Sequence, residues 1–148
     1  MAFVITAPEK FEKGRPGLPK RSIFLAGAID MGAVVDWQSY VIDAFKDCLL
    51  TVVNPRRAKF DDSTLDEQIK WELQALEDVD HIFMWFPKDA KAPISFFEAG
   101  LYWRSNKMIV GAELGFYRRR NLELTAWHYG IYLYPSLDDM IRMFNLNF

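Results

Sequence analysis

Short apolar runs that end in glycine or proline recur along this chain, and amphipathic segments with helical spacing separate them. Residues 22–28, 50–54 and 80–86 are the clearest runs, and residues 107–112 and 131–134 continue the series. A run that is apolar throughout, rather than alternating, is typical of a strand buried on both faces of a parallel sheet. The spacing therefore predicts an α/β fold: a flavodoxin-like parallel sheet of five strands with helices on both faces.

The segments between the runs carry helix start signals. Asp36 is an N-cap residue type before the helix expected over residues 36–49, and Ser136 caps the last helix. Residues 64–67 read as a capping box, and Leu65, Ile69, Leu73 and Leu76 form the apolar stripe of the helix that follows.

Two stretches are less regular. Residues 1–21 open with a short apolar run and then turn polar, which predicts an N-terminal arm or an edge strand followed by a loop. In residues 113–129 we expect a loop at the arginine run 118–120 and strand character over residues 122–127. With 148 residues and 51% hydrophobic content, the chain fits one domain over residues 1–148.

Composition excludes several classes of function. A net charge of −2 argues against a nucleic-acid-coating protein, because neutralising phosphates requires a surplus of Lys and Arg. Cys48 is the single cysteine, and His81 and His128 are the two histidines, so neither a disulfide nor a cysteine- or histidine-rich metal site is expected. The apolar runs are far shorter than the ~20 residues of a membrane span. We expect a cytoplasmic protein, because the weakly signal-like residues 20–29 read better as a strand.

Glu98 breaks a local rule. In the helix expected over residues 94–105, it falls on the apolar side with Ile94 and Leu101. A carboxylate there is costly unless it is partnered or used, and the nearby helix N-terminus favours its ionised form. One interpretation is a glycosyl nucleophile. The other is a glutamate that bonds back to the free amides of its own first turn.

Glu72 also falls inside an apolar stripe, about 20° from Leu65 on the helical wheel. Gln68 lies one turn before it and is in position to hydrogen-bond it. The alternative is a buried ion pair between Glu72 and an arginine. Two inward-turned carboxylates in different environments can divide the roles of nucleophile and acid. Since Glu72 lacks the help of a helix N-terminus, we expect it to titrate at a higher pH than Glu98.

The helix that carries Glu98 has a second apolar side, formed by Phe96, Gly100 and Trp103. A helix that is apolar on two sides is buried on two sides. We therefore expect a homo-oligomer whose interface includes Phe96 or Trp103.

Several ordered segments are similar to the nucleoside 2-deoxyribosyltransferase family, and to its short transferase-like branch in particular. The matching pieces are residues 22–32 with Asp36-Trp37-Gln38, Asn54-Pro55-Arg56-Arg57, Gln68 with Trp71-Glu72, residues 80–87, Pro93-Ile94-Ser95 and Glu98-Ala99-Gly100. The resemblance implies cleavage of the N-glycosidic bond of 2-deoxynucleosides by a retaining double displacement, with a nucleoside and a free base as partners and no metal or organic cofactor.

The resemblance also implies roles for individual residues. Glu98 maps onto the nucleophile, and Glu72 maps onto an acidic residue in contact with the base. The expected substrate-binding residues are Gly27, Ala28, Ile29, Asp30, Met31, Asn54 and Ser95.

Two positions depart from the better-known transferases. Phe24 stands where they have a tyrosine that orients the nucleophile, and Ala92 stands where they have a further acidic residue that contacts the base. The preferred base is therefore open. A nucleoside or nucleotide hydrolase, in which water replaces the second base, and a catalytically silent nucleotide-binding domain remain alternatives.

Overall fold

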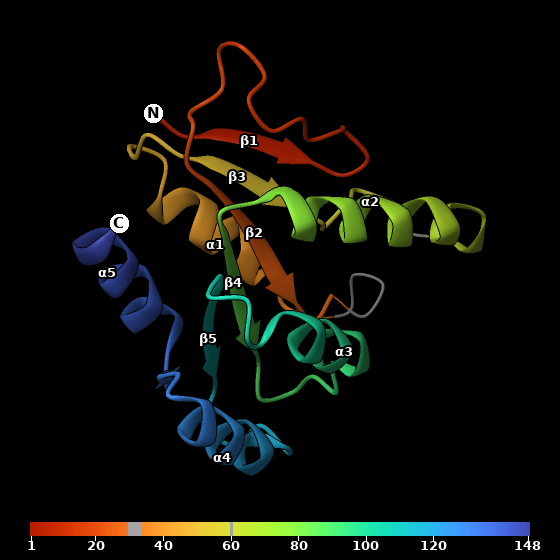
Figure 1. Cartoon of the computed structure of the whole chain (residues 1–148). Coiled ribbons are helices and arrows are strands. Elements are labelled where there is room, and N and C mark those ends of the chain that lie inside the picture. Colours follow the sequence, from red (N-terminus) through yellow and green to blue (C-terminus); the bar gives the residue numbers. More distant parts are fainter. Residues whose placement is uncertain (30–33, 60) are drawn as a thin grey trace.

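A computed structural model shows a parallel sheet between two layers of helices, and it describes residues 1–29, 34–59 and 61–148 (Figure 1). The strand order is β1-β3-β2-β4-β5-β6, and all neighbouring pairs are parallel. The strands are β1 (Phe3–Thr6), β2 (Ser22–Gly27), β3 (Thr51–Asn54), β4 (His81–Phe86), β5 (Met108–Ala112) and β6 (Leu133–Tyr134). Without β1, this order is the 2-1-3-4-5 order of the flavodoxin-like fold, which confirms the predicted fold class.

The sheet in the described part of the chain has six strands, one more than the five predicted. The additional strand is β1, which pairs with β3 at the edge of the sheet. Its four residues suffice because an edge strand needs only one neighbour, and only Ile5 is fully buried. Of the two possibilities for residues 1–21, the edge strand is the one observed.

The helices are α1 (Trp37–Ala44), α2 (Leu65–Asp78), α3 (Pro93–Tyr102), α4 (Arg119–Tyr129) and α5 (Leu137–Asn147), and a short 3-10 turn (Asp62–Thr64) precedes α2. Alternating side chains of β4 divide the core into two layers. Ile82 and Phe86 pack in the layer of α2, α3 and α4, whereas Phe83 and Trp85 pack in the layer of α1 and α5. None of the helices in the described ranges is long and apolar enough to cross a membrane.

Helix starts follow the predicted caps in two of three cases. Asp36 Oδ1 accepts a hydrogen bond from the Ser39 amide (3.1 Å), and Ser136 Oγ accepts one from the Asp139 amide (3.1 Å). The capping box at the start of α2 is not formed, because Thr64 donates its hydroxyl to the Asp61 carbonyl. Its expected partner, Glu67, pairs with Arg57 instead.

The expectation of strand character over residues 122–127 is wrong, because this stretch lies within α4. Leu122 and Ala126, four residues apart, are buried in the core, whereas Leu124 and Trp127 are exposed. The strand before this segment, β5, already pairs with β4 on one side and β6 on the other. Residues 122–127 therefore form a helix that buries one apolar stripe against the core.

Candidate active site

The predicted catalytic residues come from two helices on the same face of the sheet, Glu72 from α2 and Glu98 from α3 (Figure 1). In folds of this type, ligands bind at the carboxyl ends of the strands, where consecutive connections leave toward opposite faces. Here that point lies between β2, which leads to α1, and β4, which leads to α3. The charge of Glu72 acts on Glu98, so the structure brings the two predicted carboxyls together.

Glu98 is the sixth residue of α3, and it is only 8% exposed. No group among the described residues donates a hydrogen bond to its carboxyl, so the alternative of a bond back to the first turn of its helix is not observed there. Burial, reinforced by the negative charge of Glu72, raises the pKa of Glu98 to about 8. The side chain is therefore protonated at neutral pH in the free protein.

Glu72 lies in a different environment. Gln68 Nε2 donates to its Oε1 (3.1 Å) and also to the Pro55 carbonyl (3.0 Å), which fixes the amide between α2 and the end of β3. The predicted bond from Gln68 is thus confirmed. Burial raises the pKa of Glu72, while the Gln68 amide and the positive charge of Arg57 oppose this rise. The alternative interpretation, an ion pair between Glu72 and an arginine, is not observed among the described residues, and Arg57 pairs with Glu67 instead (3.2 Å).

The expected order of the two pKa values is wrong. The pKa of Glu98 is the one that rises far, because burial and then the negative charge of Glu72 disfavour its ionised form. Glu72 has a hydrogen-bond donor and a nearby cation, and Glu98 has neither among the described residues. Of the two carboxyls, Glu98 therefore has the stronger tendency to keep its proton.

The loop after β2 supplies the largest group of predicted substrate-binding residues. Gly27 has a φ of +152°, and a Cβ on it would lie 2.4 Å from the Trp85 carbonyl oxygen and 2.6 Å from Cζ2 of Trp37. The Trp37 indole in turn donates to the carbonyl of Ala28 (3.3 Å). Position 27 therefore requires glycine, because a Cβ there would collide with the Trp85 carbonyl and the Trp37 ring. The predicted residues Asp30 and Met31 lie outside the described residues, and Ile29, which precedes them, is half-buried.

Asn54 and Arg56 link the end of β3 to this loop. Asn54 is buried, and its Oδ1 accepts a hydrogen bond from the Arg56 amide (3.0 Å). The Arg56 guanidinium donates to the carbonyls of Val34 and Val35 and to Gln38 Oε1 (3.3 Å). Asn54 therefore stabilises the turn that follows β3. From this turn, Arg56 binds the residues that lead into α1.

Ser95, the remaining predicted substrate residue, is buried one turn before Glu98 on α3. The residue at the start of this helix, Ala92, has a left-handed φ of 56° and provides no side-chain cap. The buried Phe24 packs its ring against Trp71, with centroids 6.1 Å apart, so it provides no hydroxyl to orient Glu98.

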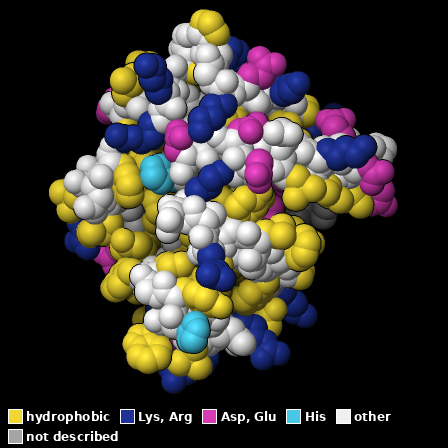
Figure 2. Space-filling view, in the orientation of Figure 1, with side chains coloured by type: hydrophobic (Ala, Val, Ile, Leu, Met, Phe, Trp, Pro, Cys, Tyr) yellow, Lys and Arg dark blue, Asp and Glu magenta, His cyan; other side chains and the backbone are white. Residues whose placement is uncertain are grey.

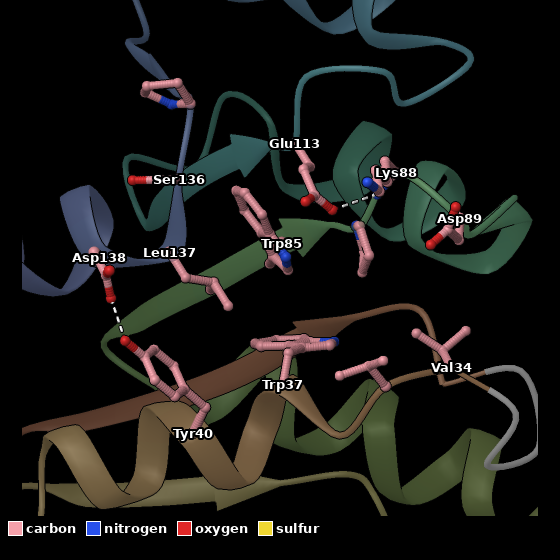
Figure 3. A pocket seen from close by; sticks show the side chains of 13 residues that line it. Val34, Trp37, Tyr40, Trp85, Lys88, Asp89, Glu113, Ser136, Leu137 and Asp138 are labelled. Atoms are coloured by element: carbon pink, nitrogen blue, oxygen red, sulfur yellow. Dashed lines mark hydrogen bonds between the residues drawn. The ribbon is translucent and has the colours of Figure 1, made fainter.

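A cavity of about 670 Å³ opens at the carboxyl edge of the sheet, on the face covered by α1 and α5 (Figure 3). The sequence analysis did not predict this cavity. Trp37 and Trp85 form its walls, and Tyr40 donates its hydroxyl to Asp138 at the start of α5. Glu113 accepts a hydrogen bond from the Lys88 amide (2.9 Å) across another wall. Their position in the chain was the available signal, because these residues lie at or just after the carboxyl ends of β4, β5 and β6 or near the starts of α1 and α5.

Phe96 and Trp103, which we expected at a subunit interface, pack against the core of the single chain. Trp103 is only 5% exposed, and the Phe96 ring stacks on Phe116 and contacts Phe86 at a tilt. The apolar residues of α3 that remain exposed are Ile94, Phe97 and Leu101, on the side next to Glu98.

Comparison with known proteins bears directly on this geometry. No curated protein matches the chain significantly. A family model described as "nucleoside 2-deoxyribosyltransferase like" matches residues 20–116, well over half of the chain. The match covers β2 through the end of β5, and it includes both Glu72 and Glu98. This protein therefore belongs to the nucleoside 2-deoxyribosyltransferase-like family.

Proposed function

We propose that this protein exchanges the bases of 2′-deoxynucleosides through a covalent deoxyribosyl intermediate on Glu98. The observation that carries the proposal is the buried pair of Glu98 and Glu72, held on neighbouring helices at the carboxyl edge of the sheet, in a chain of this family. A retaining displacement at C1′ needs a carboxylate nucleophile and a group that handles the proton of the leaving base.

The proton of the pair balances the first step. An oxygen of Glu98 forms a bond to C1′ as the C1′–N bond breaks, and the sugar passes through an oxocarbenium-like state. The nitrogen of the leaving base needs a proton, and Glu98 must lose one to attack. We assign Glu72 to this transfer: it accepts the proton from Glu98 and delivers it to the base, directly or through a water molecule.

The second step reverses the first with a new base. The incoming base attacks C1′, the ester bond to Glu98 breaks, and the proton from the base returns to the carboxyl pair. The remaining protein groups position the substrate: Arg56 holds residues 34–38, and Ser95 lies one turn from the nucleophile. The mechanism needs no metal ion and no organic cofactor.

Incubation of the protein with a 2′-deoxynucleoside, with and without a second free base, tests the proposal by chromatography. A new deoxynucleoside that appears only with the second base is the expected result. Free deoxyribose in both reactions would instead identify a hydrolase, and unchanged substrate in both would identify a silent binding domain.

A further inference from the structure

The cavity between β4, α1 and α5 carries hydrogen-bonding groups that the proposed reaction does not use (Figure 3). Its volume of about 670 Å³ lies within the range of roughly 300–1,000 Å³ that is usual for small-molecule sites. It opens at the carboxyl edge of the parallel sheet, where folds of this type bind ligands. The described residues that line it include neither Glu72 nor Glu98. The cavity is therefore a separate candidate for a ligand site.

The sheet itself lies between this cavity and the carboxyl pair. Trp85 packs in the layer of α1 and α5, on the side of the cavity. Its neighbour Phe86 packs in the opposite layer, with the helices that carry Glu72 and Glu98. Figure 2 shows hydrophobic, acidic and basic side chains mixed over the outside of the molecule. A ligand in the cavity would thus meet a chemistry of its own, on the other face of the sheet from the proposed nucleophile.

Trp85 brings an unused hydrogen-bond donor to this cavity. Its side chain is only 5% exposed, and it lies between Trp37 and Glu113 in the view of Figure 3. The Trp37 indole N–H donates to the carbonyl of Ala28 (3.3 Å), whereas the Trp85 indole N–H has no acceptor among the described residues. The indole N–H of a buried tryptophan usually has a partner. Trp85 therefore marks a position for an acceptor atom of a ligand.

Glu113 brings an acceptor to the same cavity. Its Oε1 accepts a hydrogen bond from the Lys88 amide (2.9 Å), which holds the half-buried carboxylate in the wall. Its Oε2 accepts no hydrogen bond from the described part of the chain. A carboxylate oxygen forms stronger hydrogen bonds than a neutral acceptor does. Glu113 therefore marks a position for an N–H donor of a ligand.

The charges around the cavity restrict the ligand further. The carboxylates of Asp89, Glu113 and Asp138 line it, and Lys88 is the one basic residue among the described residues of its wall. Asp138 accepts the Tyr40 hydroxyl and keeps its charge. An excess of negative charge disfavours a phosphate or carboxylate and favours an uncharged or cationic ligand. Flat aromatic walls favour a planar one.

We propose that this cavity binds a planar, amino-substituted nitrogen heterocycle that is uncharged or cationic. A ring nitrogen of the ligand accepts the Trp85 indole N–H, its amino group donates to Glu113, and its ring contacts Trp37. The proposal does not rest on the function proposed above, because the cavity shares no residue with the carboxyl pair.

The location of the ligand is tested by nuclear magnetic resonance with 9-methyladenine, whose only N–H donors belong to its amino group. The five tryptophans give five indole N–H signals in nitrogen-labelled protein, and Trp37→Phe and Trp85→Phe assign the two that matter. We expect saturable shifts of both signals at ligand concentrations up to about 5 mM, a range suited to a ligand of this size. An unmoved Trp85 signal over this range would overturn the proposal, including when Trp37 alone responds.

The chemistry of recognition is tested by calorimetry with three matched probes. We expect 9-methyladenine to bind most tightly, 6,9-dimethylpurine, which lacks the amino group, to bind at least about 5-fold more weakly, and 9-methylpurine-6-carboxylate to bind most weakly. Carboxylate affinity equal to or above that of 9-methyladenine would refute the role of the acidic wall.

Two variants test the assigned hydrogen bonds. Glu113→Gln keeps an acceptor for the Lys88 amide and removes the charge, and it should weaken 9-methyladenine about 5-fold or more while leaving 6,9-dimethylpurine unchanged. Trp85→Phe keeps a ring and removes the donor, and it should weaken both probes. The matched controls are Glu12→Gln, exposed in the loop after β1, and Trp127→Phe, 82% exposed on α4, which should bind as the wild type does.

Thermal unfolding establishes that each variant is folded, and Glu113→Gln decides the test if Trp85→Phe is not. Unchanged affinity for 9-methyladenine in Glu113→Gln would overturn the proposal. Deoxyribosyl transfer by a protein that binds none of the probes would reject this site and leave the proposed function standing. Binding as described here by a protein without transfer would have the opposite meaning.

Discussion

Glu98 is buried within reach of the charge of Glu72, and that charge adds to the burial that raises the pKa of Glu98 to about 8. The two carboxyls differ in their support, because Gln68 donates a hydrogen bond to Glu72 (3.1 Å) and Arg57 adds a positive charge beside it. The pair is thus asymmetric before any substrate binds, and each carboxyl can be tested separately.

Glu98→Ala should abolish cleavage of the glycosidic bond and leave the fold intact. Loss of a nucleophile typically lowers the rate by several orders of magnitude, and the substitution removes a polar group from a buried position. Steady-state rates with a deoxynucleoside measure the effect, and Asp66→Ala, on the exposed side of α2, is the control. Turnover near the wild-type rate would show that Glu98 is a structural residue.

The stability of the protein should fall as pH rises from about 4.5 to about 8. The folded protein holds the Glu98 proton up to about pH 8, whereas the unfolded chain releases it near the ordinary value of 4.5, so folding binds a proton in this window. Glu98→Gln removes the part of this dependence that comes from Glu98, and it should be stabilising at pH 8.5 by an amount on the order of a few kcal/mol relative to its effect at pH 5.

Urea unfolding midpoints at the two pH values measure this difference. The contribution from Glu72, whose pKa is also raised, remains in the variant and acts in the same direction. Equal effects of Glu98→Gln at both pH values would show that Glu98 has an ordinary pKa.

Glu72→Gln should slow deoxynucleosides with poor leaving bases far more than an activated nitrophenyl deoxyriboside, because glutamine preserves shape but cannot carry a proton. The substitution also removes the charge that opposes ionisation of Glu98. The acid limb of the kcat/KM profile should therefore move to lower pH. Values of kcat/KM for both substrates, from pH 5 to 9, test both effects, and equal slowing of the two substrates would leave Glu72 with a positioning role only.

Gly27→Ala should destabilise the fold by roughly 2 kcal/mol or more, since the added Cβ meets the Trp85 carbonyl oxygen and the Trp37 ring at a φ of +152°. Gly100→Ala is the matched control, because nothing lies within 4 Å of its Cβ position in α3. There we expect a gain of about 0.5–1 kcal/mol from helix propensity. Thermal unfolding of both variants checks the pair, and equal stabilities would contradict the contact with Trp37.

Local patterns in the sequence were sufficient to predict the framework of the fold. Runs such as residues 23–28 are apolar at every position, which is typical of a strand covered on both faces, and the observed β2 and β4 are buried throughout their central residues. Glu72 and Glu98 were found because each interrupts an apolar line on its helix. Local periodicity therefore predicted the elements and the pair of carboxyls.

Features that depend on contacts between distant segments were not predictable in this way. The pKa of Glu98 depends partly on the charge that α2 brings close to it, that of Glu72. The environment of Glu72 depends in turn on Arg57, which follows β3. The line from Leu65 to Leu73 was expected to face the core, but α2 instead turns Gln68 and Ala75 inward. The sequence shows which residues are apolar, and only packing shows which of two apolar sides the core takes.

The walls of the cavity in Figure 3 have a practical consequence. Trp37 and Trp85, two of the five tryptophans, both border this space at the carboxyl edge of the sheet. A planar ligand that enters it would meet their indole rings, so its arrival should quench the intrinsic fluorescence of an unlabelled protein. Trp127, exposed on α4, is outside this cavity and adds a constant signal that Trp127→Phe removes. The chain thereby carries its own optical reporter of occupancy, which can be read in the first mixing experiment with any candidate ligand.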